Sequence, residues 1–447
     1  MSGPFVDERV VVVGAGASGR AAARVLIEGG AEVWVTERGD APRDGEFAAL
    51  GVPVMAGGHR EEHLDGSTLV VTSPGVPEDA DILRWSSARE LPVWSELELG
   101  ARLCTVPYVA VTGTNGKTTA TELVASCMRA EGLDAVACGN IGHPFSLAAG
   151  EGRDALAVEA SSFQLRFSDS LRPRVSVLLN VSEDHLDWHG SMERYGEAKA
   201  RIYRLQSKGD THVGNRDDAR AAALSQDAPC DRVWFRLAEP GPGETGYRGS
   251  DLVSRIAGDA SLGPVDPGRG AGFRADAAAA AAATLAFGLR PSSVAQGIES
   301  FTPLPHRGEV VASLHGVRFV DDSKATNPHA VLAALDGLRK VVLIAGGLAK
   351  GVDLSPLASA ASSLDAVVAI GDASRELVRI FDGLVDVRAE ASIEDAVRAA
   401  SGLAAPGGTV LLAPACASQD MFRDYRERGD RFAAEVYRLA KEDAFDG

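Results

Sequence analysis

The sequence predicts an α/β protein of three domains, each with a largely parallel sheet at its centre. Its 447 residues suit three domains, since a domain usually holds about 100–200 residues. Hydrophobic residues make up 45% and charged residues 24%, which is ordinary for a globular protein, so each domain can bury a core. Apolar strand-like runs alternate with helical stretches, as in parallel α/β domains. We place the three domains at residues 1–100, 101–304 and 305–447.

The first domain begins with a strand, a glycine turn and a helix. RVVVVGAGASG (9–19) is an apolar run that enters the turn, residues 20–26 are helical, and EVWVTE (32–37) is the next strand. LVVTSPG (69–75) and PVWSELEL (92–99) are expected to be two further strands. This order predicts a Rossmann-like sheet.

The central domain opens with YVAVTGTNGKTTATELVASCM (108–128), a strand, a phosphate loop and a helix. DALAVEASS (154–162) and RVSVLLNVSEDH (174–185) are two apolar strands that end in polar clusters. Long apolar runs are typical of parallel strands covered on both faces. The pattern predicts a P-loop ATPase-like parallel sheet.

The end of the central domain has an unusual composition. Residues 236–272 are rich in Gly and Pro, which predicts an irregular surface excursion. Asp276 precedes seven consecutive alanines at 277–283. Alanine is the strongest helix former and Asp is a favoured N-cap, so we expect Asp276 to cap a helix there.

The third domain repeats the alternation of strands and helices. VRFVDDS (317–323), KVVLIAGG (340–347), DAVVAIGD (365–372) and GTVLLAPA (408–415) are expected to be strands. Helical stretches separate them, which predicts a second Rossmann-like sheet.

Charge and cysteine content exclude several classes of protein. The formal net charge of −17 and the lack of a basic stripe argue against a nucleic-acid partner. Five widely spaced cysteines without a C-x-x-C pattern argue against disulfides and zinc, and favour the cytoplasm. The apolar run at 10–13 is too short for a signal peptide or a membrane span, so we expect no membrane insertion.

A phosphate loop stands between the first strand and helix of the central domain. Glycines let backbone N–H groups close on phosphate oxygens, and a helix N-terminus favours an anion. Lys117 would reach the β- and γ-phosphates, and Thr118 would ligate Mg²⁺. The alternative is a plain glycine turn. The nucleotide-binding residues expected are Gly113, Thr114, Asn115, Gly116, Lys117, Thr118 and Thr119.

The N-terminal turn matches a diphosphate-binding glycine fingerprint. Gly14, Gly16 and Gly19 stand at the G-x-G-x-x-G positions, and Glu37 ends the next strand, where an acidic residue often binds a ribose. The turn would bind a UDP-type substrate, although NAD or FAD binding and an unoccupied structural turn remain alternatives.

Two polar residues at strand ends suggest a metal site beside the phosphate loop. Glu159 ends one apolar strand, and His185 follows the next. The carboxyl ends of strands line the ligand crevice of an open α/β sheet. The two side chains would hold Mg²⁺, whereas a capping or hydrogen-bonding role is the alternative for His185.

Lys199 is expected to point partly inward. It lies four residues after Tyr195, at the edge of an apolar helical stripe. Only seven of the 45 basic residues are lysines, so a lysine here suggests a need for a compact ammonium or a reactive amine. A carboxylate partner, a phosphate contact, a modification and a solvated position all remain open.

Three loops follow strands of the third domain. They are 322–327 (DSKATN), 346–351 (GGLAKG) and 413–418 (APACAS). Two of them carry scarce lysines, which makes the carboxylate of a second substrate a plausible target. Arg307, near the boundary, would reach the ATP phosphates when the domains close.

Together these motifs resemble the Mur ligase family over nearly the whole chain. The resemblance rests on TGTNGKTT, the strand of Glu159, NVSEDHLD, YGEAKARIY, LPHR and DDSKATN. GAGASG, TSPGVP and LLAPACASQDMF resemble the D-glutamate-adding branch. The resemblance implies a monomeric cytoplasmic ligase of peptidoglycan precursor synthesis, which serves cell wall, cell shape and cell division. It would join UDP-N-acetylmuramoyl-L-alanine to D-glutamate through an acyl phosphate, with ATP and Mg²⁺, and give ADP and phosphate.

The resemblance also implies roles for individual residues. Catalysis would depend on Lys117, Glu159, His185 and Lys199, with Lys199 carbamylated as a metal ligand beside Thr118, Glu159 and His185. ATP would also contact His306, Arg307 and Asp322. The UDP-substrate would contact Gly14, Ala15, Gly16, Ser18, Gly19, Thr36, Glu37, Ser73, Gly75, Asn140, Ser162 and Gln164. D-Glutamate would contact Lys324, Thr326, Lys350, Ser418 and Tyr425, the last standing where the family often has phenylalanine.

Three rival functions remain at this point. Another ligase of the superfamily would add a different amino acid or act on a folate-like substrate. An oxidoreductase would use the glycine fingerprint but would leave the phosphate loop unexplained. A non-catalytic nucleotide-binding protein would leave Glu159, His185 and Lys199 without a role.

Overall fold

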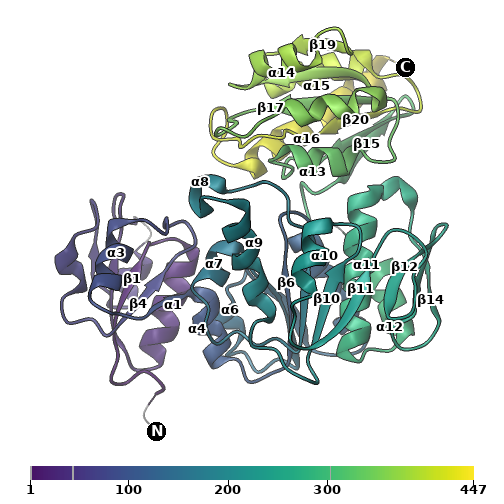
Figure 1. The fold of residues 1–447 in the computed structure, drawn as a ribbon. Coiled ribbons are helices and arrows are strands. Elements are labelled where there is room, and N and C mark those ends of the chain that lie inside the picture. Colours follow the sequence, from purple (N-terminus) through teal and green to yellow (C-terminus); the bar gives the residue numbers. More distant parts are fainter. Residues whose placement is uncertain (1–2, 43–44, 303, 447) are drawn as a thin grey trace. The chain divides into compact units, whose positions relative to one another are not determined.

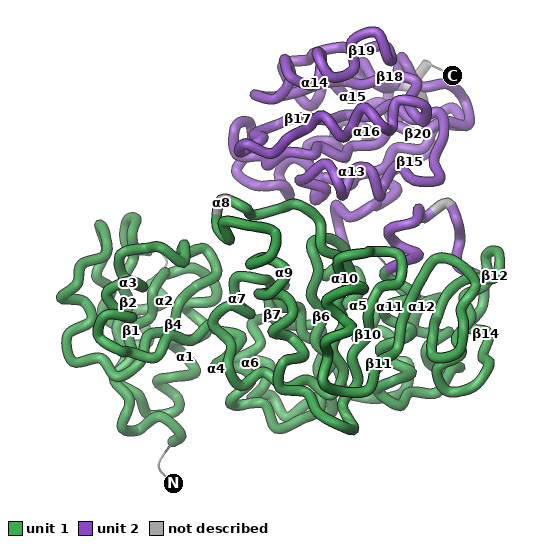
Figure 2. Tube along the Cα trace, in the orientation of Figure 1, with its two compact units in different colours: residues 1–264, 276–301 green, residues 265–275, 302–447 purple. Residues whose placement is uncertain are grey.

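The computed structural model describes residues 3–42, 45–302 and 304–446. It contains three sheets, and the chain divides into two compact units. One unit comprises residues 1–264 and 276–301, and the other comprises residues 265–275 and 302–447 (Figure 2). The first unit holds two of the sheets, and the second unit holds the third (Figure 1).

The first sheet is parallel throughout, with the strand order β3-β2-β1-β4-β5. Its strands are β1 (Arg9–Val13), β2 (Glu32–Thr36), β3 (Val54–Met55), β4 (Leu69–Thr72) and β5 (Val93–Ser95). The helical segments are α1 (Ala17–Glu28), α2 (Glu46–Ala49), η1 (Glu61–Leu64) and α3 (Asp81–Ala88). The direction of strand addition reverses between β1 and β4, and such a switch point opens a ligand crevice at the strand carboxyl ends. The Rossmann-like prediction is confirmed.

One predicted strand of this region is only partly correct. The segment 92–99 forms β5 for three residues and then turns into α4 (Glu96–Leu103). Ser95 caps the helix by accepting a hydrogen bond from the N–H of Glu98. The apolar alternation in SELEL resembles a strand, but the Ser cap followed by Glu in the first turn starts a helix.

The central sheet has the order β14-β13-β12-β11-β10-β9-β6-β8-β7. Its parallel strands are β6 (Tyr108–Thr112), β7 (Ala135–Gly139), β8 (Ala155–Glu159), β9 (Val175–Leu178), β10 (Thr211–Asn215), β11 (Asp231–Phe235) and β12 (Glu244–Arg248). β6, β8 and β9 are buried throughout. Because β6 lies between β8 and β9, the loops after these three strands meet at one edge of the sheet.

Helices alternate with the strands of the central sheet along the sequence. They are α5 (Lys117–Ala130), α6 (Phe145–Ala148), α7 (Ser162–Arg166), α8 (Leu186–His189), α9 (Met192–Ala200), η2 (Arg201–Tyr203), α10 (Ala219–Ser225), η3 (Pro267–Arg269), α11 (Gly270–Phe287) and α12 (Pro291–Glu299). The division into two units falls inside α11.

Two expectations for the end of this region are wrong. The Gly/Pro-rich stretch 236–272 holds β12, β13 (Asp251–Ser254) and β14 (Ala260–Pro264), which extend the sheet with antiparallel pairs. Its glycines serve the tight turns between these short strands, as at Gly249 with φ +66°. Asp276 does not cap a helix, because α11 already begins at Gly270.

The third sheet has the order β15-β16-β20-β17-β18-β19. The strands are β15 (Glu309–Leu314), β16 (Val317–Asp321), β17 (Val341–Gly346), β18 (Leu364–Ile370), β19 (Asp386–Ala389) and β20 (Thr409–Leu412). The helical segments are α13 (Pro328–Leu335), η4 (Ser355–Ser363), α14 (Ser374–Phe381), α15 (Ile393–Leu403) and α16 (Tyr425–Asp446). All four predicted strands are present, and β15 is an antiparallel edge strand. β16, β20 and β17 are parallel neighbours, so the loops that follow them are adjacent.

Within the described part of the chain, no helix has both the length and the apolar character needed to cross a membrane.

Candidate active site

The phosphate loop closes around its own lysine. Gly116 has a left-handed backbone (φ +82°), and α5 begins at the next residue. The ammonium of Lys117 donates to the carbonyl oxygens of Gly113 (2.9 Å) and Thr114 (2.8 Å). The side-chain oxygen of Asn180 accepts from the N–H groups of Thr114 and Asn115 at 3.0 and 2.9 Å. The loop is therefore held in shape from inside and from the end of β9.

Asp276 takes a position against this loop that the sequence did not indicate. A Cβ at Gly116 would lie 2.1 Å from the Asp276 carboxylate oxygen, so only glycine fits there. The carboxylate is buried on α11. A residue expected to cap a helix instead restricts the loop.

Glu159 connects two of the predicted functions. Thr118, in the first turn of α5, donates its hydroxyl to one Glu159 oxygen at 2.6 Å. The side-chain amide of Asn140 donates to the other oxygen at 2.9 Å. Glu159 is 2% exposed, at the carboxyl end of β8. The structure thus joins a residue predicted to bind metal to one predicted to bind the UDP-substrate.

This pair fits a magnesium ion. Hydroxyl and carboxylate oxygens are ligands that Mg²⁺ prefers, and Mg²⁺ is often held by one or two protein groups with substrate phosphates completing its shell. Within the described ranges, no group of three or more His, Cys, Asp or Glu side chains is arranged to hold a metal. Thr118 and Glu159 therefore suit an ion that is bound together with a nucleotide.

Lys199 is buried against the phosphate loop, and the solvated alternative is wrong. It is 1% exposed, and its amine donates to the Gly113 carbonyl oxygen at 2.7 Å. The nitrogen lies 4.3 Å from the centre of the Tyr195 ring. Burial, with a further contribution from the charge of Lys117, holds the pKa of Lys199 well below its usual range, whereas Asp184 opposes the shift. A neutral amine is a nucleophile, which an ammonium is not.

Two histidines stand beside this lysine in different environments. His185 has φ +54° and a side chain 44% exposed, and its ring lies 4.8 Å from that of Phe163. It occupies the N-cap of α8, but its side chain does not cap the helix. His189 is buried and shares a 2.9 Å hydrogen bond with the Ser162 hydroxyl.

Sequence reasoning missed His189. Burial, together with the charge of Lys199, lowers its pKa to about 4, so the imidazole is neutral at physiological pH. The available signal was its spacing, because it follows His185 by four residues, which is one helical turn.

The glycine fingerprint packs against the end of β4. Gly14 has φ +97°, and a Cβ there would lie 2.8 Å from the Ser73 hydroxyl oxygen. A Cβ at Gly19 would lie 2.0 Å from the Gly14 carbonyl oxygen, so both positions need glycine. Ala15 donates its N–H to the Glu37 carboxylate at 2.7 Å. Burial acts to raise the pKa of Glu37, but the N–H groups of Gly39 and Ala15 lower it overall.

The hydroxyl of Thr36 is shared by two histidines absent from the sequence prediction. It lies 3.0 Å from Nδ1 of His59 and 2.8 Å from Nδ1 of His63. Burial lowers the pKa of both imidazoles. Thr36 is itself fully buried, and these two histidines are the partners of its hydroxyl.

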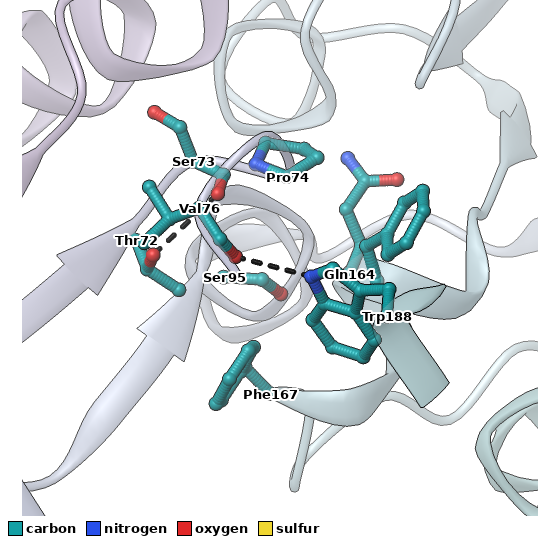
Figure 3. Close-up of a pocket in the computed structure, with 9 residues that line it drawn as sticks. Thr72, Ser73, Pro74, Val76, Ser95, Gln164, Phe167 and Trp188 are labelled. Carbon is teal, nitrogen blue, oxygen red and sulfur yellow. Dashed lines mark hydrogen bonds between the residues drawn. The ribbon is translucent and has the colours of Figure 1, made fainter. Parts of the chain in front are cut away.

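A small pocket lies beside the switch point of the first sheet (Figure 3). The indole N–H of Trp188 donates to the Val76 carbonyl oxygen across this pocket at 3.3 Å. Predicted UDP-substrate residues Ser73 and Gln164 line it, whereas Gly75 is exposed on the loop after β4. The lining residues are Thr72, Ser73, Pro74, Val76, Ser95, Phe163, Gln164, Phe167 and Trp188.

In the second unit, the predicted ATP-contacting residue His306 pairs with a buried acid, Asp321, that the sequence analysis did not single out. Nδ1 of His306 lies 2.7 Å from the Asp321 carboxylate. Burial raises the pKa of Asp322 to about 7, while Arg307 opposes the shift and Asp321 adds to it. Asp322 is therefore partly protonated near neutral pH.

The predicted D-glutamate residues lie on adjacent strand-end loops of this unit. The Lys324 amine lies 4.0 Å from the centre of the Tyr425 ring. Leu348 and Ala417 form an antiparallel bridge, which ties the loop of Lys350 to that of Ser418. Ser418 is buried, whereas Thr326 is half-buried and Lys350 is exposed.

Family models match three separate parts of the chain. They are the Mur ligase MurD-like N-terminal domain over residues 8–95, the Mur ligase middle domain over 111–241, and the Mur ligase glutamate ligase domain over 306–416. The UDP-N-acetylmuramoylalanine–D-glutamate ligase of Frankia casuarinae is 44% identical, over 96% of this chain and 93% of that protein. The chain belongs to the Mur ligase family. The enzyme of the same name from Salinibacter ruber is 41% identical, over 95% of this chain and 96% of that protein.

Solved structures share the fold of this Mur ligase at lower identity. A UDP-N-acetylmuramate–alanine ligase from Thermotoga maritima has a TM-score of 0.62 at 19% identity, covering 97% of this chain and 100% of that one. A pseudomurein peptide ligase type C from Methanothermus fervidus has a TM-score of 0.61 at 18% identity, with the same coverage of 97% and 100%. Because the glycine fingerprint falls within the matched MurD-like N-terminal domain, the oxidoreductase alternative is not supported.

Proposed function

We propose that this Mur ligase joins UDP-N-acetylmuramoyl-L-alanine to D-glutamate, with ATP converted to ADP and phosphate. The observation that carries the chemistry is the Thr118–Glu159 contact of 2.6 Å beside a closed phosphate loop. The substrates come from the relatives, which are named for this reaction and match nearly the full length of this chain. The reaction would belong to peptidoglycan precursor synthesis, and it would thereby serve cell-wall growth, cell shape and cell division.

The reaction needs an activated carboxylate. A carboxylate is a poor electrophile with a poor leaving group, and transfer of the γ-phosphoryl group to it gives an acyl phosphate. The amine of the second substrate then attacks the carbonyl carbon, and phosphate leaves. Lys117 and the N–H groups of the loop hold the phosphates in line for this transfer, since phosphoryl transfer depends on positioning and charge stabilisation. Thr119, from the same loop, would also contact the phosphates.

Mg²⁺ would be held by Thr118 and Glu159, and it would screen the anions that approach one another. His185 is the further metal ligand in this proposal. Lys199, whose amine has lost much of its basicity, would add CO₂ and release a proton to give a carbamate, and the carbamate oxygens would contribute to the same metal site. Burial favours this reaction because only the neutral amine adds CO₂.

The N-terminal crevice would hold the UDP-substrate. The fingerprint loop of Gly14–Gly19 offers backbone N–H groups at the start of α1, which favours a diphosphate. Ser73, Asn140 and Gln164 would orient the sugar and the reacting carboxylate, with Ser162 held by the neutral His189.

The second unit would supply the remaining contacts. His306, Arg307 and Asp322 would bind ATP, and the loops of Thr326, Lys350 and Ser418 would bind D-glutamate. We further propose domains at 1–100, 101–304 and 305–447, a monomer, and a cytoplasmic location.

The deciding experiment measures ADP release by the purified protein with ATP, Mg²⁺ and UDP-N-acetylmuramoyl-L-alanine. We expect release to require D-glutamate, and L-glutamate to be inactive. Release that D-glutamate does not stimulate would refute this substrate pair. A screen of other amino acids would then identify the second substrate, and sedimentation of the same sample would test the monomer.

A further inference from the structure

Among the described residues, the largest fully buried side chain has no role in the chemistry proposed above. Arg428, in the first turns of α16, has 0% exposure. No ion pair with Asp or Glu is found for it across the described residues. Burial lowers its pKa to about 10, so it keeps its charge at neutral pH. Burying an arginine without a carboxylate is costly, and a buried charge needs other polar partners.

Those partners are main-chain and hydroxyl oxygens of two strand-end loops. From the loop after β16, the guanidinium donates to the Ser323 hydroxyl (3.0 Å) and to the Ser323 carbonyl oxygen (2.8 Å). From the loop after β20, it donates to the carbonyl oxygens of Cys416 (3.2 Å) and Ala417 (3.5 Å). A planar fork with five donors can make this set of bonds, whereas a lysine cannot.

The third loop is fixed through the second. The N–H of Leu348 donates to the Ala417 carbonyl oxygen at 2.9 Å, and the N–H of Ala417 donates back at 3.1 Å. A Cβ at Gly347 would lie 3.3 Å from Nη1 of Arg428, so the glycine brings this loop against the guanidinium. One side chain therefore ties together the loops after β16, β20 and β17.

These are the loops that carry Lys324, Thr326, Lys350 and Ser418. We propose that Arg428 is a positioning residue, which presets these three loops for the carboxylates of the incoming amino acid. The guanidinium does not itself touch the substrate, since it is fully buried. It acts through Ser323, whose hydroxyl also donates to the Tyr425 carbonyl oxygen at 2.7 Å, and through Ala417, the neighbour of Ser418. The inference rests on the proposed function, which assigns both the amino acid and the loops that bind it.

The test compares Arg428→Lys and Arg428→Gln with wild type, using the KM values for D-glutamate, ATP and UDP-N-acetylmuramoyl-L-alanine. Losing charge-assisted hydrogen bonds of this kind should raise the KM for D-glutamate at least about tenfold. The KM for UDP-N-acetylmuramoyl-L-alanine should stay within about twofold, because its proposed contacts lie in the first unit. The KM for ATP, which Asp322 in the loop after β16 would contact, should rise less than the KM for D-glutamate. Phe432→Leu is the matched control, since Phe432 is a fully buried core residue on the same helix. It should lower Tm without separating the three KM values.

Two results would overturn the proposal. One is an unchanged KM for D-glutamate in folded Arg428→Lys, and the other is a rise shared equally by all three substrates. If both Arg428 variants fail to fold, Ser323→Ala removes the bridging hydroxyl and keeps the guanidinium. A D-glutamate KM at the wild-type value in that variant would equally refute the proposal.

Failure of the proposed function gives a different pattern. Wild type would then be inactive with D-glutamate, and the same KM comparison would be made with the amino acid that it does use. Hydrogen exchange of the loop amides gives a readout that needs no substrate. In Arg428→Lys, the amides of Leu348, Ala415 and Ala417 should exchange faster than in wild type, and unchanged protection would count against the positioning role.

Discussion

Lys199 in the first unit and Arg428 in the second unit are both long basic side chains buried without an ion pair in the part of the chain described. Each donates to carbonyl oxygens of loops that follow parallel strands: Lys199 to Gly113, and Arg428 to residues after β16 and β20. Burial depresses both pKa values, but it leaves Arg428 at about 10 and takes Lys199 well below its usual range. The two regions thus bury a basic side chain in the same way, but the effect on its charge differs.

The difference teaches which residue suits which task. An arginine under such burial remains a permanent cation and can only organise its surroundings. A lysine under the same burial becomes much less basic, so it can release its proton and react as an amine. The first unit has a group that can be modified, and the second has one that cannot.

The largest effect should come from Lys117, the half-buried lysine of the phosphate loop, whose charge adds to the lowering of the Lys199 pKa. Lys117→Ala should lower kcat by at least about 10²–10³, as expected for removing a preorganised charge contact. Circular dichroism should show a folded protein. Lys208→Ala, at an exposed lysine, is the control and should keep wild-type kcat. Full turnover by folded Lys117→Ala would remove the assignment.

Lys199→Arg breaks the comparison directly by putting an arginine at the lysine's position. The guanidinium cannot form the carbamate, so kcat should fall by about 10² or more. Wild type supplied with ¹³C-bicarbonate should show a carbamate carbon signal by NMR that the variant lacks. A variant with wild-type kcat would show that Lys199 is needed only as a cation, as Arg428 is.

His212 extends the comparison to a buried histidine that has no proposed role in the reaction. Burial keeps its imidazole neutral. It is fully buried between the hydroxyls of Ser176 (2.7 Å) and Ser225 (2.9 Å), and burial lowers its pKa to about 3. Unfolded histidine titrates near pH 6.5, so below that pH the unfolded chain binds more protons. The free energy of unfolding should therefore decrease by about 1.4 kcal/mol per pH unit as the pH falls from about 6.5 towards 3. Urea unfolding of wild type at pH 6.5 and 5.5 measures this slope.

His212→Gln is the matched variant for that slope. It should be less stable than wild type at pH 7.5, because the serine pair loses its partner. The gap in the free energy of unfolding should narrow by about 1 kcal/mol between pH 6.5 and 5.5, since the variant lacks the titrating group and the unfolded histidine is already half protonated at pH 6.5. Parallel pH curves for the two proteins would contradict the assignment.

The smallest effect should come from Tyr425, which shapes the side of the second unit's site. Tyr425→Phe keeps the ring beside the Lys324 amine, so the KM for D-glutamate should change by less than about twofold. Tyr425→Leu removes a cation–π contact worth about 1 kcal/mol, which corresponds to about a fivefold rise in that KM. Equal effects of the two changes would show that the ring has no role.

The sequence predicted most of the fold because strand ends and loops are local signals. The segments around Gly113 and Gly14 carry strand, turn and helix within about 20 residues, a range where periodicity and glycine chemistry decide the structure. The inward orientation of Lys199 followed from its helical spacing, and the structure buries it completely. The Gly/Pro-rich stretch 236–272 was misjudged because short antiparallel strands owe their stability to neighbouring strands, not to composition.

The site was less predictable where contacts between residues far apart in the sequence determine the role of a side chain. Asp276 was assigned to its own helix, but its position depends on packing against Gly116, more than 150 residues earlier. His189 and Arg428 carry no motif, and one more arginine in an arginine-rich chain attracts no notice. Their roles follow from burial and partners, which a single sequence does not display.

Helix α4 has a consequence for how such proteins can be cut and recombined. It carries Glu96 and Glu98, both fully buried in spite of their charge. Glu96 accepts from the N–H of Ser146 (2.6 Å), and Glu98 from the N–H groups of Asp169 (2.8 Å) and Ser170 (2.9 Å). A gene fusion that joins two parental chains at residue 100 would divide this helix between them. Glu96 and Glu98 would then face loops from the other parent. A crossover placed after Leu103, where α4 has ended, would keep the helix whole, although the loops that donate to Glu96 and Glu98 would still have to match.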